Sequence, residues 1–276
     1  MLAKLRGQRI ALFEARLASE ICDLVRRNGG VPVCAPAVRE RRRPAGAEVA
    51  ALLDEVAPEP APVFVFSTGV GATALFDEAR SLGRAGELRE ALSRGSSICR
   101  GPKPVAALHK EGIAATLKAR APYTTTEFIE VLLETNLAGR LVALVHYGER
   151  NAALVDALLS RGARLRELTL YEWELPEDTG PLVRIVEDLC QGSFAAAAFT
   201  TQIQGRNLLA IADEIGMRER LLVALRSGVV VAAVGPTCAR VLGELGIAAE
   251  VVPEMPKMGA MLSALFARLA GAEALP

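Results

Sequence analysis

An internal duplication constrains the fold of this sequence more than any other feature. Strands, loops and helices recur in the same order in two halves, at offsets of 132 to 134 residues. The apolar run Arg9–Phe13 corresponds to Leu141–Val145, and Cys99–Ile113 aligns with Ala233–Ile247 with its Gly, Pro, Ala and Leu residues in register. Three modules repeated in one order predict two structurally related lobes.

The order of elements within each half predicts the fold class. In the first half, the strand Arg9–Phe13 is followed by a helix at Ala18–Asn28, which Gly29 and Gly30 end, and then by a strand at Val31–Cys34. Short connections between strand, helix and strand favour right-handed crossovers and a parallel sheet with helices on both faces. Two such sheets give an α/β fold of two similar lobes.

The second half repeats the series, with a helix predicted at Ala152–Ser160 and a strand at Leu165–Tyr171. Three segments rich in proline or charge are expected to be irregular: Arg39–Gly46, Pro58–Pro62 and Pro176–Pro181. The first of these is basic and could contact nucleic acid. One short basic run is more often a solvated loop, which is the interpretation we adopt.

Length and charge limit the classes of partner. With 276 residues the chain is long enough for two ordinary domains. Its 32 basic and 32 acidic residues cancel, so no overall field favours nucleic acid or an anionic membrane. No apolar run approaches the ~20 residues that span a bilayer, and no export signal is visible. We expect a cytoplasmic monomer with reduced cysteines and with no nucleic-acid or membrane partner.

Four loops follow predicted strands and precede predicted helices. Ligands of open α/β sheets bind beyond the carboxyl ends of the strands, where such loops lie. Each loop presents backbone N–H groups and the positive end of a helix dipole, which suit a carboxylate or phosphate. Ser, Thr and Pro in any one loop are explained as helix caps, but four repeated loops favour a shared anionic ligand. The loops are Ser67–Gly71, Gly101–Lys103, Thr200–Gln202 and Gly235–Thr237.

Motifs for other chemistry are missing. The Gly69-Val70-Gly71 run lacks the third glycine of a dinucleotide-binding loop, because position 74 is alanine. His109 and His146 are the only histidines, and two such residues rarely make a metal site. No nucleophile and base stand in a recognisable motif. We therefore expect no metal, no cofactor and no covalent catalysis.

Four segments are distinctive: Val63–Phe76 (VFVFSTGVGATALF), Gly101-Pro102 with the following helix, Leu168–Trp173 (LTLYEW) and Ala232–Leu242 (AAVGPTCARVL). In the order and spacing of these segments, the sequence resembles the uroporphyrinogen-III synthase family over essentially its whole length. Tyr171 lies where the family carries a tyrosine at the crossover between lobes. The chain differs from the family at Glu14-Ala15-Arg16, where the family has Arg-Pro, and at Val70-Gly71, where it has Asn-Gly.

The resemblance implies an architecture and a reaction. It implies lobes that each take chain from both halves, residues 1–38 with 174–276 and residues 39–173, joined by a two-stranded crossover. The reaction is the cofactor-free cyclisation of hydroxymethylbilane, in which the terminal hydroxyl leaves as water and the last pyrrole ring is inverted. Because this substrate carries eight carboxylates, it matches the four loops predicted to bind anions.

The resemblance also suggests site residues. Tyr171 is either a hydrogen-bond donor to the departing hydroxyl or a packed aromatic of the crossover. Thr237 and the amides beside it are expected to hold a carboxylate, more specifically than the matching loop of the first half. The predicted substrate-binding residues are Arg16, Ser67, Thr68, Gly69, Gly101, Lys103, Thr200, Thr201, Gln202, Gly235, Pro236 and Thr237.

Two other functions fit the same sequence. One is a non-catalytic domain of this family that senses or regulates through a bound tetrapyrrole. The other is a two-lobed binding protein for a small polar ligand, a class that usually carries an export signal.

Overall fold

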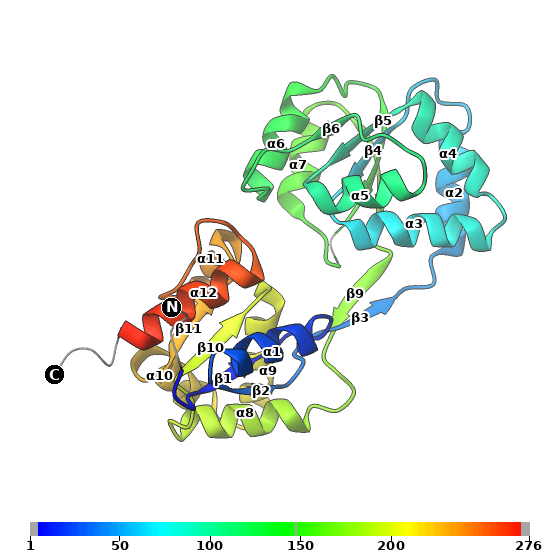
Figure 1. The fold of residues 1–276 in the computed structure, drawn as a ribbon. Coiled ribbons are helices and arrows are strands. Elements are labelled where there is room, and N and C mark those ends of the chain that lie inside the picture. Colours follow the sequence, from blue (N-terminus) through cyan, green and yellow to red (C-terminus); the bar gives the residue numbers. More distant parts are fainter. Residues whose placement is uncertain (1–4, 147, 272–276) are drawn as a thin grey trace. The chain divides into compact units, whose positions relative to one another are not determined.

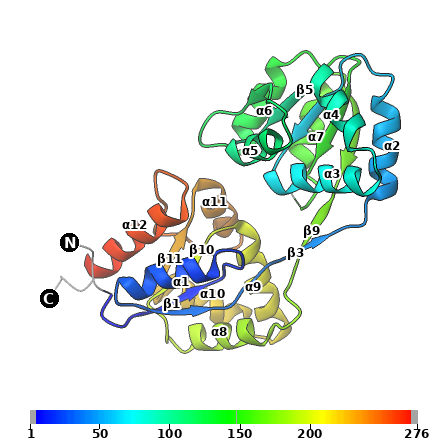
Figure 2. The same ribbon diagram turned by 45° about the vertical axis from the view of Figure 1, so that its right-hand side comes forward.

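The chain divides into two compact units in the computed structural model, which describes residues 5–146 and 148–271 (Figures 1 and 2). Unit 1 comprises Met1–Arg39 and Glu174–Pro276, and unit 2 comprises Glu40–Trp173. Each unit contains one parallel sheet with helices on both faces. This architecture confirms the α/β fold predicted from the repeat.

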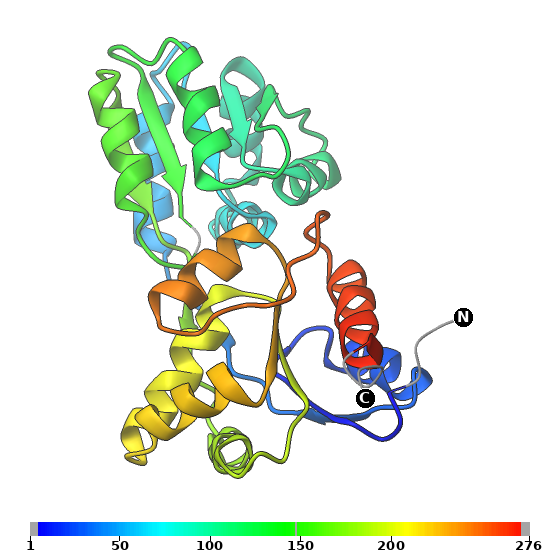
Figure 3. The same ribbon diagram turned by 90° about the vertical axis from the view of Figure 1, so that its left-hand side faces the viewer.

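Unit 1 has a four-stranded parallel sheet in the order β11-β10-β1-β2. Its strands are β1 (Arg9–Leu12), β2 (Val31–Cys34), β10 (Ala196–Phe199) and β11 (Val230–Ala233). Its helices are α1 (Ala18–Arg27), α8 (Gly180–Cys190), α9 (Gln202–Glu214), α10 (Arg218–Ser227), α11 (Pro236–Glu244) and α12 (Met258–Gly271) (Figure 3).

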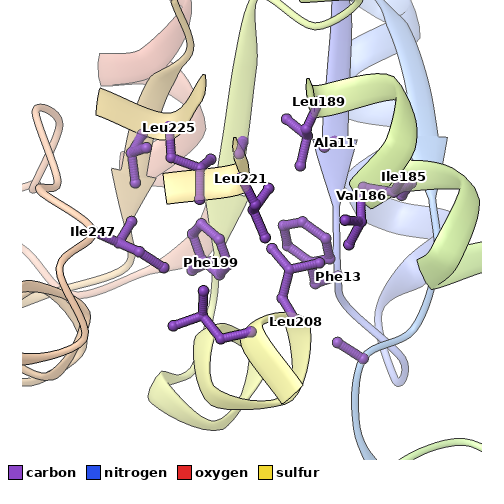
Figure 4. Packing of buried hydrophobic residues seen from close by; sticks show 14 of the residues in the cluster. Ala11, Phe13, Ile185, Val186, Leu189, Phe199, Leu208, Leu221, Leu225 and Ile247 are labelled. Atoms are coloured by element: carbon purple, nitrogen blue, oxygen red, sulfur yellow. The ribbon is translucent and has the colours of Figure 1, made fainter. Parts of the chain in front are cut away.

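Alternating side chains of these strands divide between two cores. Ala11 and Phe13 face helices α8 to α11, whereas Ile10 and Leu12 face α1 and α12. The rings of Phe13 and Phe199 stack with centroids 4.8 Å apart at the centre of the first core (Figure 4). These buried strands carry small and branched residues, which allow helices to cover both faces of the sheet.

Unit 2 has a five-stranded parallel sheet in the order β6-β5-β4-β7-β8. Its strands are β4 (Val63–Phe66), β5 (Ser96–Cys99), β6 (Leu117–Lys118), β7 (Leu141–Val145) and β8 (Arg164–Leu168). Helices α2 to α5 cover one face, and α6 and α7 cover the other. These helices are α2 (Gly46–Val56), α3 (Gly69–Ser81), α4 (Ala85–Arg94), α5 (Pro102–Lys110), α6 (Thr125–Glu134) and α7 (Ala152–Ser160).

The two sheets repeat each other, but the two sequence halves are exchanged between them. The order β11-β10-β1-β2 in unit 1 corresponds to β5-β4-β7-β8 in unit 2. Strands β1 and β2 come from the first half, and β1 pairs with β10 from the second. Strands β7 and β8 come from the second half, and β7 pairs with β4 from the first. Neither half of the sequence therefore forms a unit alone.

The basic segment at Arg39 is a strand, so the prediction of a loop there was wrong. Strand β3 (Arg39–Arg42) forms a two-stranded sheet with β9 (Tyr171–Glu174). The side chain of Arg39 pairs with Glu174 at 3.1 Å, and Arg41 pairs with Glu172 at 3.1 Å. The glutamates neutralise the arginines, which removes the like-charge repulsion that would otherwise disfavour a strand of this composition.

The strand predicted over Leu165–Tyr171 is divided in the structure. Its first part is β8, which ends at Leu168, and its last residue, Tyr171, begins β9. Leu170 between them is buried against the α2 to α5 core of unit 2. The chain thus leaves one sheet and enters another within a segment predicted as a single strand, a change that periodicity alone does not reveal.

Candidate functional site

The carboxyl end of strand β4 brings three predicted residues together. Thr68 caps helix α3, since its Oγ1 accepts a hydrogen bond from the Gly71 N–H at 3.0 Å. The same Oγ1 lies 2.9 Å from the hydroxyl of Tyr171, a residue that is only 1% exposed. Ser67 is 3% exposed, and its Oγ has no hydrogen-bond partner among the residues that the structure describes. Either Ser67 or Thr68 was expected to cap this helix, and the N-cap is Thr68.

Helices α3 and α5 begin beside each other at this edge. A Cβ at Gly69 would lie 2.8 Å from the backbone oxygen of Lys103, so glycine permits the close approach. Pro102 lies in the first turn of α5, as predicted, and Gly101 is the N-cap. Pro102 and Pro104 have no N–H, which leaves Lys103 as the one backbone donor among the first three residues of α5. This helix end is therefore poorer in N–H groups than an ordinary helix N-terminus.

The loop after β7 supports the aromatic side chains of β9. Gly148 has φ +66°, and a Cβ there would lie 2.1 Å from Nε1 of Trp173. The ring of Trp173 meets that of Tyr171 edge to face, with centroids 5.5 Å apart. Tyr171 is therefore fixed both by packing and by its hydrogen bond to Thr68, so both interpretations of this residue remain compatible with its position.

A buried histidine lies beside this loop. His146 is 1% exposed, and its Nδ1 accepts a hydrogen bond from the Asn151 N–H at 3.3 Å. This leaves the Nε2–H to donate to Glu167 Oε2 at 2.8 Å. Arg150 donates to both oxygens of Glu167, at 2.8 and 2.9 Å. Although burial opposes it, hydrogen bonding from Arg150 and His146 lowers the pKa of Glu167.

The lowered pKa of Glu167 predicts a pH effect on stability. A carboxylate whose pKa is lower in the folded chain contributes stability above its unfolded pKa of about 4.3 and loses it as the pH falls through the folded value. We expect the urea midpoint of the wild type to fall more steeply between about pH 5 and pH 3 than that of Glu167→Gln. The exposed α6 variant Glu130→Gln should follow the wild type. Parallel curves for wild type and Glu167→Gln would contradict the assignment.

The matching edge of unit 1 satisfies its own hydrogen bonds. Thr201 is the N-cap of α9, as one of the two threonines was predicted to be. However, the N–H groups of Thr200 and Thr201 donate to Gln204 Oε1 at 2.7 and 3.2 Å. The expectation that Thr200–Gln202 offers free N–H groups is therefore wrong for its first two residues. A side-chain amide already occupies the position of an anion.

Glu14 fills a second position at this edge. Its Oε1 accepts hydrogen bonds from the N–H groups of Arg16 and Leu17, at 3.1 and 3.4 Å. Its Oε2 accepts a hydrogen bond from the hydroxyl of Thr200. The predicted anion-binding residue Arg16 is exposed and lies next to this carboxylate, whose negative charge disfavours a second carboxylate nearby.

The start of α11 keeps the predicted geometry. Gly235 is the N-cap and Pro236 occupies the first turn, with Pro236 and Thr237 both exposed. A Cβ at Gly235 would lie 2.7 Å from Cβ of Pro256, so the loop before α12 lies on this glycine. Since Thr237 and Cys238 retain their N–H groups, this helix has more donors in its first turn than α5.

Several residues at these edges were not singled out from the sequence. Gln204 reaches back to its own N-cap, and Glu167 is placed by the register of β7 with β8. The repeat could have identified two of these edge residues, because Glu14 and His146 follow β1 and β7 at equivalent positions. Different residues at one repeated position indicate that the two edges have diverged.

Among the described residues, no three His, Cys, Asp or Glu side chains gather as they would around a metal ion. Within the same residues, no helix has the length and apolar composition needed to cross a membrane. Burial raises the pKa of Cys99 to about 12 and that of Cys238 to about 11, so neither thiol is a ready nucleophile.

Sequence comparisons relate the chain to proteins of one kind. A family model described as uroporphyrinogen-III synthase HemD matches residues 19–263. The uncharacterized protein YjjA of Bacillus subtilis is 31% identical over 258 residues, which are 94% of this chain and 94% of that protein.

Solved structures agree with the sequence comparisons. A mutant uroporphyrinogen III synthase from Thermus thermophilus has a TM-score of 0.74 and 26% identity, and the match covers 96% of this chain and 100% of that chain. The uroporphyrinogen-III synthetase of Helicobacter pylori has a TM-score of 0.56 over 95% of this chain and 99% of that chain. At 15% identity, this second match supports the fold alone.

Proposed function

Because the chain belongs to the uroporphyrinogen-III synthase family, we propose that it converts hydroxymethylbilane to uroporphyrinogen III and water. The terminal hydroxyl of the linear tetrapyrrole leaves as water, and the resulting cation is attacked by the substituted carbon of the last pyrrole. The spiro intermediate then fragments and recloses with that ring inverted. The protein acts mainly by holding the linear tetrapyrrole in a conformation that closes with inversion faster than it closes without inversion, which is a positioning role.

The observation that carries the proposal is the pair of hydroxyls at the start of α3. Thr68 Oγ1 has two acceptor positions and one hydrogen. It accepts from the Gly71 N–H, and it accepts from Tyr171 when the phenol donates. The Thr68 hydrogen is then left to donate to the departing hydroxyl of the substrate. Tyr171 would thus assist through Thr68, which is consistent with its 1% exposure.

The remaining predicted residues hold carboxylates in this proposal. At the unit 2 edge these are Ser67, Gly69, Gly101 and Lys103. At the unit 1 edge, the start of α11 takes the larger share, since Thr237 and its neighbours have N–H groups to offer. Thr200, Thr201 and Gln202 contribute less, because Gln204 and Glu14 already satisfy much of that loop. The reaction needs no metal and no cofactor, and the functional form is a cytoplasmic monomer.

One assay tests the proposed reaction. The purified chain is incubated with hydroxymethylbilane, and the products are oxidised and resolved by isomer. We expect the type III isomer to dominate, whereas a protein-free control gives the type I isomer by spontaneous closure. Type I product alone, at every protein concentration, would contradict a synthase.

The unit 1 edge favours a second candidate, a non-catalytic tetrapyrrole-sensing domain. Glu14 and Gln204 occupy N–H groups that a substrate carboxylate would otherwise take. A domain of this kind would bind uroporphyrin with a measurable Kd and leave the isomer ratio of the product unchanged. The assay above, combined with porphyrin fluorescence quenching, separates it from the synthase. A chain that shows neither activity would be a binding protein for another small polar ligand.

A further inference from the structure

Tyr123 has an unusual backbone conformation at the carboxyl edge of unit 2. Its φ of +63° lies in the left-handed region, and among the described non-glycine residues only Arg6 also has a positive φ, at 44°. Bulky L-residues rarely adopt this region, whereas glycine enters it without steric penalty. A tyrosine held here retains strain that a glycine would remove, and residues with such strain cluster at functional sites.

The ring of Tyr123 lies on the N-cap of α5. A Cβ at Gly101 would lie 3.3 Å from Cγ and 3.5 Å from Cδ1 of this ring. The side chain is half-buried, and its hydroxyl has no hydrogen-bond partner among the described residues. One part of the ring is therefore seated on the backbone, and the rest is available to a ligand.

The chemistry around the ring suits a flat ligand that carries a carboxylate. Pro102 and Pro104 have no N–H, so the start of α5 lacks two backbone donors and by itself binds an anion weakly. The exposed ammonium of Lys103 follows directly, and α5 has no acidic residue in its first turn. An aromatic ring on Gly101, followed along the chain by the backbone N–H and exposed side chain of Lys103, matches a pyrrole ring with an acidic substituent.

We propose that Tyr123 is a substrate-positioning residue whose ring stacks on one pyrrole of the linear tetrapyrrole while Lys103 holds a carboxylate of that same pyrrole. This inference rests on the proposed function and adds to it the residue that orients a ring. The equivalent glycine of unit 1, Gly235, is covered by Pro256 instead. The stacking surface is therefore a property that distinguishes the α5 edge from the α11 edge.

Three variants test the role of the ring. Tyr123→Phe keeps the ring, whereas Tyr123→Leu and Tyr123→Gly remove it. We expect the Phe variant to keep KM within about twofold of wild type, and the Leu and Gly variants to raise KM and the Kd for uroporphyrin III about tenfold. Their kcat should change much less than KM. The Gly variant should keep its thermal midpoint within a few degrees, because relief of strain offsets the lost ring contacts.

Arg6→Gly is the matched control, since it relieves strain at the other positive-φ residue, and it should leave KM and the isomer ratio unchanged. If the wild type forms type III product and both Tyr123→Leu and Tyr123→Gly keep a normal KM, the stacking role of Tyr123 would be overturned, whereas the proposed function would stand. An equal loss in Tyr123→Phe would assign the effect to the hydroxyl and also overturn stacking. A lower kcat together with a higher KM and a lower thermal midpoint would indicate a structural role for Tyr123 and would also overturn the inference. A wild type that neither forms type III product nor binds uroporphyrin would overturn both proposals.

Discussion

Replacing Gly148 with alanine is expected to destabilise unit 2 by about 4 kcal/mol. The left-handed φ of +66° disfavours any side chain, and the added Cβ would lie 2.1 Å from Nε1 and 2.2 Å from Cδ1 of Trp173. Because these atoms belong to a rigid indole ring, the whole ring must shift. The shift would also remove the edge-to-face contact with Tyr171. We expect a lower urea midpoint and, if the proposed reaction holds, a reduced share of type III product.

Gly139→Ala is the control for this effect. Gly139 has a similar φ of +70°, but no atom lies within 4 Å of the position of an added Cβ. Its variant should therefore show only the backbone strain, about 1 to 2 kcal/mol. Equal losses in the two variants would mean that the indole ring adapts without penalty.

If the proposed reaction holds, Tyr171→Phe is expected to lower kcat for type III formation about 100-fold, the scale of a lost proton donor. The variant keeps the packed ring but removes the hydroxyl that lies 2.9 Å from Thr68 Oγ1. Without this donor, Thr68 loses the polarisation that makes its own hydrogen acidic. Spontaneous closure then competes, so the ratio of type III to type I product should fall as well. Steady-state kinetics with isomer analysis measure both quantities.

Substitutions at Thr68 separate the two hydroxyls. Thr68→Val removes the proposed donor and the cap of α3, so it should lose at least as much activity as Tyr171→Phe. Thr68→Ser retains the hydroxyl and should remain near wild type. Unchanged turnover and isomer ratio in Tyr171→Phe would show that this residue is a packed crossover aromatic and nothing more.

Local signals explain why much of the fold was predictable. Gly29 and Gly162 adopt positive φ just after helices, as glycines that end helices commonly do. Thr68 and Pro102 begin helices where cap preferences place them. These features depend on residues a few positions apart, and the repeat gives two copies of each, so one copy supports the other.

Long-range partners explain what was missed. The pairs between β3 and β9 join residues more than 130 positions apart, such as Arg41 and Glu172. Similarly, whether the N–H of Thr200 is free depends on where the amide of Gln204 points, and the cover on Gly101 is the ring of Tyr123, which comes from a different loop. Sequence patterns identify the loops at a sheet edge, but the hydrogen bonds already formed there decide which loops can bind.

The exchange of halves between the units has a consequence for synthesis on the ribosome. Strand β1 leaves the ribosome early, yet its neighbour β10 follows about 180 residues later. At roughly 5 to 20 residues per second, the nascent β1-α1-β2 segment waits about 10 to 40 s with one edge of β1 unpaired. Unit 2, by contrast, is continuous in sequence from Glu40 to Trp173. We expect unit 2 to fold first during translation, and the early segment to need protection from premature pairing until β10 emerges.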